Sequence, residues 1–272
     1  MRHDPSNALS SESKEPTDGP RAPSGSQTLL RGLDVIEAVV DGPVTLPELA
    51  TKLGLTRSTA HRLAMALIER RYITFTPRLG YLSGPKLLEL GFAAQRQTDV
   101  VQVARPHLES LAASTEDTVH IGVRDGDRAL YLDKIPGRRR VEISSRVGDR
   151  QPLTATGLGK ALLLDEAPGG WEALVAADRG SGARPIDFPT WQTRMNGYVA
   201  GGHAYDLEEN EDLIRCVAAP VRDASSRIVG AISVSSAAQY MDDERMARLT
   251  DEVRDAAHAI SRDLGWSQPD HK

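Results

Sequence analysis

Two helix starts lie eleven residues apart in this chain, at Thr45 and Thr56. Residues 45–48 are Thr-Leu-Pro-Glu, a capping box in which the threonine caps the helix and the glutamate reaches back to it. The proline lies in the first turn, where its missing N–H costs little. Gly54 suits the left-handed end of this helix, and Thr56 caps the next helix almost at once. A short helix, a tight turn and a second helix predict a helix-turn-helix.

The segments on either side predict a winged version of this motif. A first helix is expected over residues 27–40, where Leu29, Leu33, Ile36 and Val40 recur at helical spacing. After the third helix, residues 72–75 and 80–83 resemble strands around a turn that contains Pro77 and Gly80. A hairpin directly after a recognition helix is a wing, so residues 26–85 are predicted to form a winged helix-turn-helix domain.

The third helix presents polar residues at its N-terminal end. Arginine can contact guanine edges or phosphates, hydroxyls can contact phosphates, and a helix N-terminus favours anions. Arg78, at the tip of the wing, suits phosphate or minor-groove contact, although solubility alone also explains an arginine there. An ordinary three-helix cap is the alternative to a DNA-binding motif. The predicted DNA-contacting residues are Thr45, Thr56, Arg57, Ser58, Thr59, His61, Arg62 and Arg78.

The charge distribution favours DNA binding more than the net charge of −5 does. Residues 26–91 carry eight Lys and Arg against six Asp and Glu, while residues 92–272 carry 22 against 28. The positive excess is densest over residues 57–71, where four arginines face one glutamate. Site-specific DNA binding needs such a local basic patch, and a solvated helix face is the alternative.

Composition predicts a cytoplasmic protein. Hydrophobic residues make up 40% of the chain, which is enough for a packed core. No apolar run approaches the roughly 18–20 residues that span a bilayer, and no secretory signal is visible, so no membrane partner is expected. The single cysteine, Cys216, excludes an intrachain disulfide and a Cys-rich zinc site, and we expect neither a metal nor a cofactor. Residues 1–25, rich in Ser, Pro and Gly, are predicted to be a disordered tail.

The remainder predicts a linker and a mixed α+β domain. A helix over residues 86–97, within a linker assigned to 86–99, suits either a rigid connector or a dimer seam. Residues 100–268 then alternate helical and strand patterns, and an Asp-Gly step at 125–126 marks a hairpin. Residues 138–140, three arginines, are typical of a solvated hairpin end. A helix is expected from about Val100, strands over 119–123, 129–135, 141–146, 216–221 and 227–235, and further helices over 157–164, 171–177, 189–196 and 241–264.

Several motifs, in this order, resemble the IclR family of regulators from residue 27 to about residue 265. In the first domain they are the helix-turn-helix over 46–67, the wing, and Leu-Ser-Gly-Pro-Lys-Leu-Leu-Glu-Leu-Gly at 82–91. In the second they are Leu-Thr-Ala-Thr-Gly-Leu-Gly-Lys-Ala-Leu at 153–162, Asp-Leu-Glu-Glu-Asn-Glu at 206–211, Arg-Cys-Val-Ala-Ala-Pro-Val at 215–221 and Ala-Ile-Ser-Val-Ser at 231–235.

The resemblance implies a winged helix, a linker helix and a GAF/profilin-like mixed α+β effector domain. It implies homodimers or homotetramers on operator DNA, controlled by a small organic, aromatic or sugar acid. Two departures stand out: Thr154 replaces a histidine common in relatives, and a Gly-rich piece at 201–205 suggests an insertion or a duplicated turn before Asp206. The effector-binding residues implied by the family are Gly157, Leu158, Asp206, Cys216, Ser233 and Ser235.

The residues themselves leave alternatives open. Gly157 and Leu158 enter a helix and could offer backbone N–H groups to an acid, or form a plain helical turn. Ser233 and Ser235, two apart on a strand, face one side and suit either a ligand or backbone hydrogen bonds. Cys216 suits a small buried hydrophobe better than a nucleophile. The rival functions are an enzyme using Cys216 or the acids at 206–209, and a protein-interaction adaptor. The sequence identifies neither the effector nor the operator, and does not separate repressor from activator.

Overall fold

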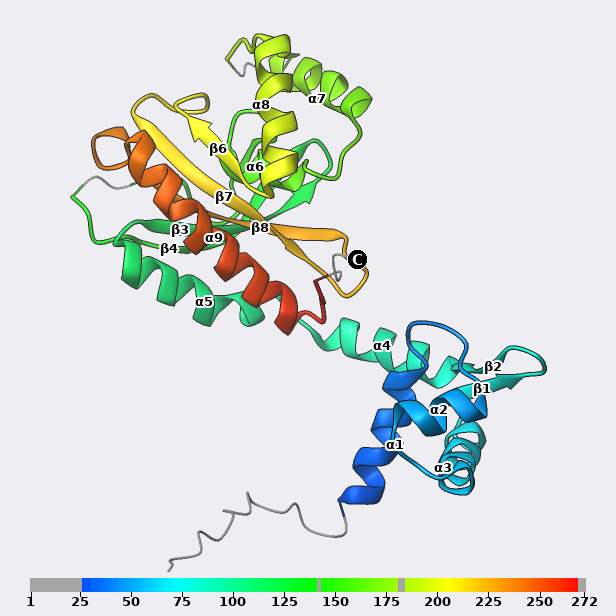
Figure 1. The fold of residues 1–272 in the computed structure, drawn as a ribbon. Helices are drawn as coiled ribbons and strands as arrows, with labels where there is room; N and C mark the ends of the chain where they lie inside the picture. The colour runs from blue at the N-terminus through cyan, green and yellow to red at the C-terminus, as the bar shows by residue number, and fades with distance from the viewer. Residues whose placement is uncertain (1–25, 141–142, 181–183, 269–272) are drawn as a thin grey trace, which may run out of the picture. The chain divides into compact units, whose positions relative to one another are not determined.

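The computed structural model describes residues 26–140, 143–180 and 184–268, which divide between Arg96 and Gln97 into two compact units (Figure 1). The tail predicted over residues 1–25 lies outside the described residues. Each unit has its own hydrophobic core.

The first unit is a winged helix-turn-helix, as predicted. Its helices and strands follow the order α1 (Gln27–Ala38), α2 (Leu46–Lys52), α3 (Arg57–Glu69), β1 (Ile73–Thr76), β2 (Gly80–Ser83) and α4 (Pro85–Gln97). The predicted capping box forms, because the Thr45 backbone N–H donates to Glu48 Oε2 at 2.9 Å. Gly54 adopts the left-handed conformation, with φ +61°. The Thr59 backbone N–H donates to Thr56 Oγ1 at 3.2 Å, so Thr56 caps α3.

The helix predicted over residues 27–40 is present as α1, but most of the apolar residues that predicted it are not on its buried side. Val35, Ala38 and Val39 form the buried side of this segment, whereas Leu29 is 65% and Leu33 is 45% exposed. The helix carries two apolar stripes, and this small unit covers only the one that packs against Leu49 and the wing. The other stripe stays on the surface.

The second unit is a mixed α+β domain built on an antiparallel sheet. Its six described strands follow the order β5-β4-β3-β8-β7-β6. Helices α5 and α9 cover one face, and α6, α7 and α8 cover the other (Figure 1). The strands are β3 (Thr118–Asp125), β4 (Arg128–Ile135), β5 (Arg150–Pro152), β6 (Ala204–Leu207), β7 (Ile214–Arg222) and β8 (Ile228–Ala237). The helices are α5 (Val100–Thr115), α6 (Gly157–Leu162), α7 (Pro168–Gly180), α8 (Phe188–Gly201), the short 3-10 helix η1 (Ala238–Tyr240) and α9 (Asp243–Asp263).

Alternation along the strands separates two cores. Side chains such as Ile121, Val217 and Ile232 pack against α5 and α9, while their neighbours Ala218 and Ala231 lie under α6. Successive strand residues face opposite sides of a sheet, so one face is bulky and aliphatic and the other is lined by small residues. The small residues allow α6 to approach the sheet closely.

One predicted strand differs from the structure. The strand expected over residues 141–146 is wrong in its described part, 143–146, which is irregular. The carbonyl groups of Ile143 and Ser145 accept hydrogen bonds from Lys134 Nζ, at 2.7 and 2.8 Å, and β4 pairs with β5 instead. Residues 141–142 lie outside the described residues.

The Gly-rich piece before Asp206 is the end of a helix. Helix α8 continues past the predicted stop at residue 196 to Gly201, because Met195 and Tyr198 are buried against the core. Gly202 ends it in the left-handed conformation, with φ +65°. The next residues form strand β6, which the sequence analysis missed.

Candidate DNA-binding surface and effector site

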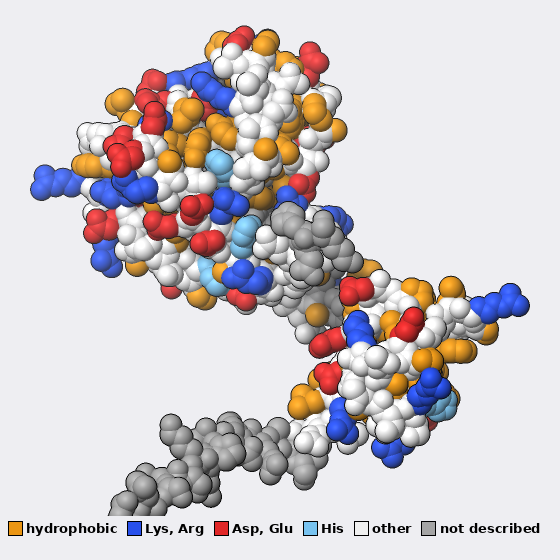
Figure 2. Space-filling view, viewed as in Figure 1, with side chains coloured by type: hydrophobic (Ala, Val, Ile, Leu, Met, Phe, Trp, Pro, Cys, Tyr) orange, Lys and Arg blue, Asp and Glu red, His pale blue; other side chains and the backbone are white. Residues whose placement is uncertain are grey.

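The N-terminal end of α3 is an exposed polar surface. Arg57, Ser58, His61 and Arg62 are exposed and Thr59 is half-buried, whereas Ala60 on the opposite side is fully buried. Several Lys and Arg side chains project from this unit in Figure 2. The arrangement leaves the guanidinium groups available for phosphates or base edges.

The other predicted DNA contacts lie at helix caps and at the wing. The Thr45 backbone N–H, and then its Oγ1 at 2.7 Å, donate to Glu48 Oε2 and lower the pKa of Glu48. Both Thr45 and Thr56 remain exposed although each caps a helix. Arg78 is exposed in the turn between β1 and β2 and has φ +72°, a left-handed conformation that points to a tight wing tip. DNA contact by these three residues stays a prediction.

Four of the predicted effector-site residues lie in two neighbouring rows across one face of the sheet. Asp206 on β6 pairs with Cys216 on β7, which pairs with Ser235 on β8. Ser233 lies two residues before Ser235 and therefore on the same face. All four side chains are buried. The strand register thus brings together residues that are up to 29 positions apart in the chain.

The remaining two, Gly157 and Leu158, begin α6 above this face. A Cβ on Gly157 would lie 2.3 Å from Cys216 Sγ and 3.1 Å from the Asp206 backbone nitrogen, so only glycine fits. The Leu158 side chain is fully buried in the core beneath α6 and α7, which leaves its backbone as the part available to a ligand.

Gly157→Ala is expected to destabilise the second unit by about 1–3 kcal/mol, because the added methyl group overlaps the Cys216 sulfur. Removing that sulfur with Cys216→Ala should reduce the loss, so the double variant should be more stable than the sum of the single changes implies. Urea unfolding of the four proteins measures this coupling. Strictly additive losses would contradict the close contact between α6 and β7.

Burial controls the titration of the acidic and thiol groups here. Burial raises the pKa of Asp206 to about 6, and Lys160 together with hydrogen bonds from the Glu209 and Asn210 backbones opposes the rise. Burial likewise raises the pKa of Cys216 to about 12. The thiol therefore stays protonated near neutral pH, which does not suit a nucleophile.

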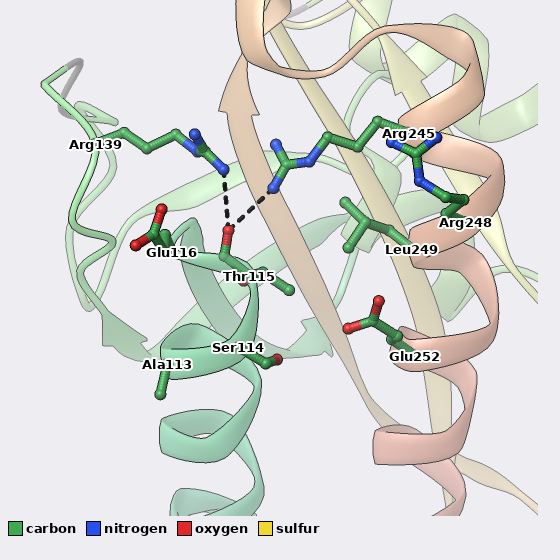
Figure 3. A pocket seen from close by; sticks show the side chains of 9 residues that line it. All are labelled: Ala113, Ser114, Thr115, Glu116, Arg139, Arg245, Arg248, Leu249 and Glu252. Carbon is green, nitrogen blue, oxygen red and sulfur yellow. Dashed lines mark hydrogen bonds between the residues drawn. The ribbon is translucent and has the colours of Figure 1, made fainter.

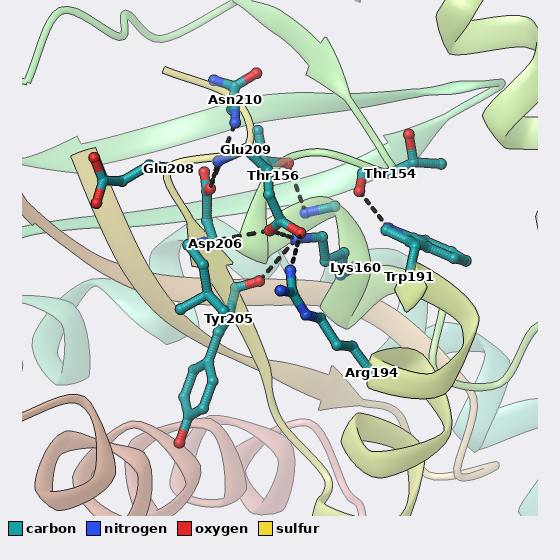
Figure 4. A network of polar contacts seen from close by, with 12 residues as sticks. Thr154, Thr156, Lys160, Trp191, Arg194, Tyr205, Asp206, Glu208, Glu209 and Asn210 are labelled. Carbon is teal, nitrogen blue, oxygen red and sulfur yellow. Dashed lines mark hydrogen bonds and ion pairs between the residues drawn. The ribbon is translucent and has the colours of Figure 1, made fainter. Parts of the chain in front are cut away.

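A buried ion pair, which the sequence analysis missed, joins α6 to the acidic loop after β6 (Figure 4). Lys160 is 1% exposed; its Nζ donates to the Tyr205 carbonyl at 2.9 Å and pairs with Glu209. Arg194 of α8 donates to the other oxygen of Glu209 at 3.1 Å. The motif at 153–162 contained Lys160, but its partners Tyr205 and Glu209 lie 45 and 49 residues away and left no local signal.

The acidic loop is already committed to these structural contacts. Glu208 accepts from the Leu213 backbone N–H at 3.1 Å, and Glu209 holds two cations. Among residues that the structure describes, no three His, Cys, Asp or Glu side chains are grouped to hold a metal ion. The acids at 206–209 thus offer no free pair for general acid–base chemistry.

Asp206→Asn is expected to stabilise the protein at pH 7.5 but not at pH 4. Between about pH 4 and 6 the folded carboxyl is protonated while the unfolded one is ionised, so the free energy of unfolding falls as the pH rises through this window. Above it the penalty is complete, on the order of 1–3 kcal/mol, and asparagine removes it. Urea unfolding at both pH values measures the effect.

Asp212→Asn is the matched control, because Asp212 is an exposed carboxylate whose pKa is lowered by Arg184. That change removes a favourable ionised form and should give no gain at pH 7.5. A gain from Asp206→Asn that is equal at pH 4 and pH 7.5 would show that desolvation of the carboxylate is not its cause.

A cavity of about 350 Å³ lies elsewhere in this unit, between the end of α5 and the start of α9 (Figure 3). It contains none of the predicted effector residues. Arg139 lines it and pairs with the fully buried Asp117, so the interpretation of residues 138–140 as a solvated hairpin end is wrong for Arg139. Arg138 and Arg140 are exposed, as expected.

Comparison with known proteins identifies both units. The IclR helix-turn-helix domain matches residues 28–77, and the bacterial transcriptional regulator IclR C-terminal domain matches residues 92–262. The chain belongs to the IclR family. It is a DNA-binding transcriptional regulator of the effector-modulated type that defines this family.

Two curated IclR relatives from Escherichia coli align with nearly the whole chain. The HTH-type transcriptional regulator XynR is 31% identical over 246 residues, which cover 88% of this chain and 98% of XynR. The DNA-binding transcriptional repressor YiaJ is 30% identical over 257 residues, which cover 91% of each chain.

Solved structures of IclR regulators have the same fold. The Agobacterium tumefaciens repressor BlcR has a TM-score of 0.74 and 24% identity, over 89% of this chain and 98% of BlcR. Pseudomonas aeruginosa HmgR has a TM-score of 0.75 and 24% identity, over 90% of this chain and all of HmgR. Among the described residues of this IclR protein, no helix is long and apolar enough to cross a membrane.

Proposed function

We propose that this IclR-family regulator binds operator DNA through the N-terminal end of α3. When a small organic acid binds the second unit, the protein dissociates from the DNA or changes its arrangement on it. The observation that carries the proposal is the exposed row of Arg57, Ser58, His61 and Arg62 at the start of the second helix of the motif. A recognition helix contacts base edges with its N-terminal residues. Because a protein that binds operator DNA must be in the same compartment as the DNA, we propose that this one is cytoplasmic.

The proposed domains are a tail over residues 1–25, the winged helix-turn-helix over 26–85, a linker over 86–99 and an effector-binding and oligomerisation domain over 100–268. The proposed effector site is the sheet face that carries Asp206, Cys216, Ser233 and Ser235, with the α6 backbone at Gly157 and Leu158. Hydroxyl, thiol and carboxyl groups gathered on one buried face suit a small polar ligand. We also propose that the protein is not an enzyme. The Cys216 thiol is protonated near neutral pH, and the acids at 206–209 take part in structural contacts.

Homodimers or homotetramers form part of the proposal. None of the residues of α4, all of which are described, is buried, and Leu88 and Phe92 are 65% and 61% exposed. The uncovered leucines of α1 lie in the same unit. Exposed apolar stripes of this kind are typical of protein–protein contacts. A two-fold dimer would place two recognition helices about 34 Å apart, or a multiple of that distance.

The direct test is a gel shift of the purified protein on the intergenic DNA upstream of its own gene, at two salt concentrations, with a panel of small organic, aromatic and sugar acids. Selective binding that weakens with salt and changes with one acid is expected, because phosphate contacts release counterions and an effector shifts the populations of DNA-binding geometries. Selective DNA binding that no acid alters would refute the effector class. Absence of selective binding would favour the adaptor or enzyme alternatives.

A further inference from the structure

His120 lies on the same face of the sheet as the proposed effector residues, one strand beyond Ser233, and no motif in the sequence marks it. It belongs to β3 and pairs with Ser233 on β8 and with Lys134 on β4. Paired residues of neighbouring antiparallel strands point to the same side of the sheet, so the imidazole lies beside the Ser233 hydroxyl. Its side chain is almost entirely buried, with the residue 1% exposed.

Only one of the two ring nitrogens has a partner. His120 Nε2 lies 2.8 Å from Ser145 Oγ, while Nδ1 is buried without a hydrogen-bond partner within residues 26–140, 143–180 and 184–268. The ring is also packed on Tyr131, with centroids 5.0 Å apart, which fixes its orientation. A buried polar atom without a partner destabilises the fold, so the unpartnered Nδ1 on this face needs an explanation.

The charges around His120 limit what could supply the missing partner. Burial and the positive charge of Lys134 lower the pKa of His120 to about 3, so the imidazole is neutral and carries one proton. The Lys134 ammonium is occupied by the carbonyls of Ile143 and Ser145. A carboxylate at Nδ1 would therefore meet no free counter-charge there, whereas a hydroxyl pairs with Nδ1 whichever ring nitrogen holds the proton.

We propose that His120 is a specificity-determining residue of the effector site, and that its Nδ1 takes a hydroxyl oxygen of the effector. The effector is then a hydroxylated acid, with its hydroxyl at His120 and Ser233, and the equivalent acid without that hydroxyl binds weakly. This inference rests on the proposed function, because it assumes that the sheet face binds the effector.

Two substitutions separate ligand recognition from structural support. The amide of asparagine occupies the place of Nδ1, and the longer amide of glutamine reaches the place of Nε2. His120→Asn should therefore keep recognition of the effector hydroxyl. His120→Gln should keep the hydrogen bond to Ser145 but lose recognition of the hydroxyl. Ser145→Ala removes the Nε2 partner only and should leave recognition in place.

The measurement is the affinity of the full-length wild type and the three variants for matched acid pairs, by calorimetry without DNA. The pairs are lactate and propionate, 3-hydroxybutyrate and butyrate, and gluconate and 2-deoxygluconate. For at least one pair the wild type should prefer the hydroxylated member by about tenfold or more, which His120→Gln should reduce to about twofold. Thermal unfolding confirms that each variant is folded.

The outcomes separate this inference from the proposed function. Acid binding with an unchanged preference in His120→Gln, or equal losses in His120→Asn and His120→Gln, would overturn the role of His120 alone. Wild-type protein that binds acids without preferring the hydroxylated member of any pair would also overturn it. Wild-type protein that binds none of the acids would overturn the proposed effector class together with this inference.

Discussion

Replacing Asp117 with alanine should lower the free energy of unfolding of the second unit by about 3–5 kcal/mol, the cost of removing the buried partner of two partly buried cations. Its side chain is fully buried and accepts from Arg139 Nε and Arg245 Nη2, both at 2.5 Å. The Ser236 hydroxyl donates to the same carboxylate at 2.7 Å. Both arginines also donate to the Thr115 carbonyl, so the alanine variant would leave two guanidinium groups short of acceptors (Figure 3).

Arg248→Ala is the matched control for this prediction. Arg248 lines the same cavity, but its partner is the exposed Glu244 on the same helix. Exposed pairs four residues apart on a helix contribute little, so this change should leave the unfolding midpoint in urea nearly unchanged. Equal losses from the two variants would show that the buried carboxylate contributes no more to stability than an exposed ion pair does.

Asp117 and its three partners, Arg139, Arg245 and Ser236, also support the effector face from the opposite side of the sheet. Ser236 follows Ser235 on β8, and successive strand residues point to opposite faces. The carboxylate therefore ties the strand that carries Ser233 and Ser235 to the ends of α5 and α9. Loss of Asp117 should loosen the effector face as well as lower stability.

Local chemistry made the first unit predictable. The capping box at Thr45, the left-handed Gly54 and the cap at Thr56 each involve residues within a few positions, so the sequence alone contains their causes. The buried side of α1 was not predictable in this way. Two apolar stripes satisfy helical spacing equally well, and only the packing around Leu49 decides between them.

Long-range contacts account for most of what was missed in the second unit. Strand β6 has four residues, and its pairing with β7 is decided by register across the sheet. Residues 143–146 have strand-like composition, yet Lys134 occupies two of their carbonyls.

The effector-site residues were available only through family resemblance, which carried over Asp206, Cys216, Ser233 and Ser235. It carried over neither the Lys160–Glu209 pair nor His120. The role of each of those side chains depends on neighbours that are 14 or more residues away in the chain, such as Lys134 and Glu209.

Replacing Arg57 and Arg62 together with alanine should weaken operator binding by at least about 100-fold, because one good arginine contact to a base edge or phosphate contributes roughly 10- to 100-fold. Both side chains are exposed at the N-terminal end of α3, and neither belongs to the buried core of the described residues. The double variant should therefore unfold at the wild-type temperature. Its affinity should also depend less steeply on salt, since fewer phosphate contacts release fewer counterions.

Arg70→Ala is the control that separates position from charge. Arg70 is also exposed, but it lies at the C-terminal end of α3, about 20 Å from Arg57 at 1.5 Å per residue. Its removal should change operator affinity less than about threefold, and neither variant should alter acid binding by the second unit. Fluorescence anisotropy on the upstream DNA at two salt concentrations measures the first effect, and calorimetry measures the second. Equal losses of DNA binding in the two variants would mean that the unit attracts DNA by net charge, and would remove the N-terminal end of α3 as the reading surface.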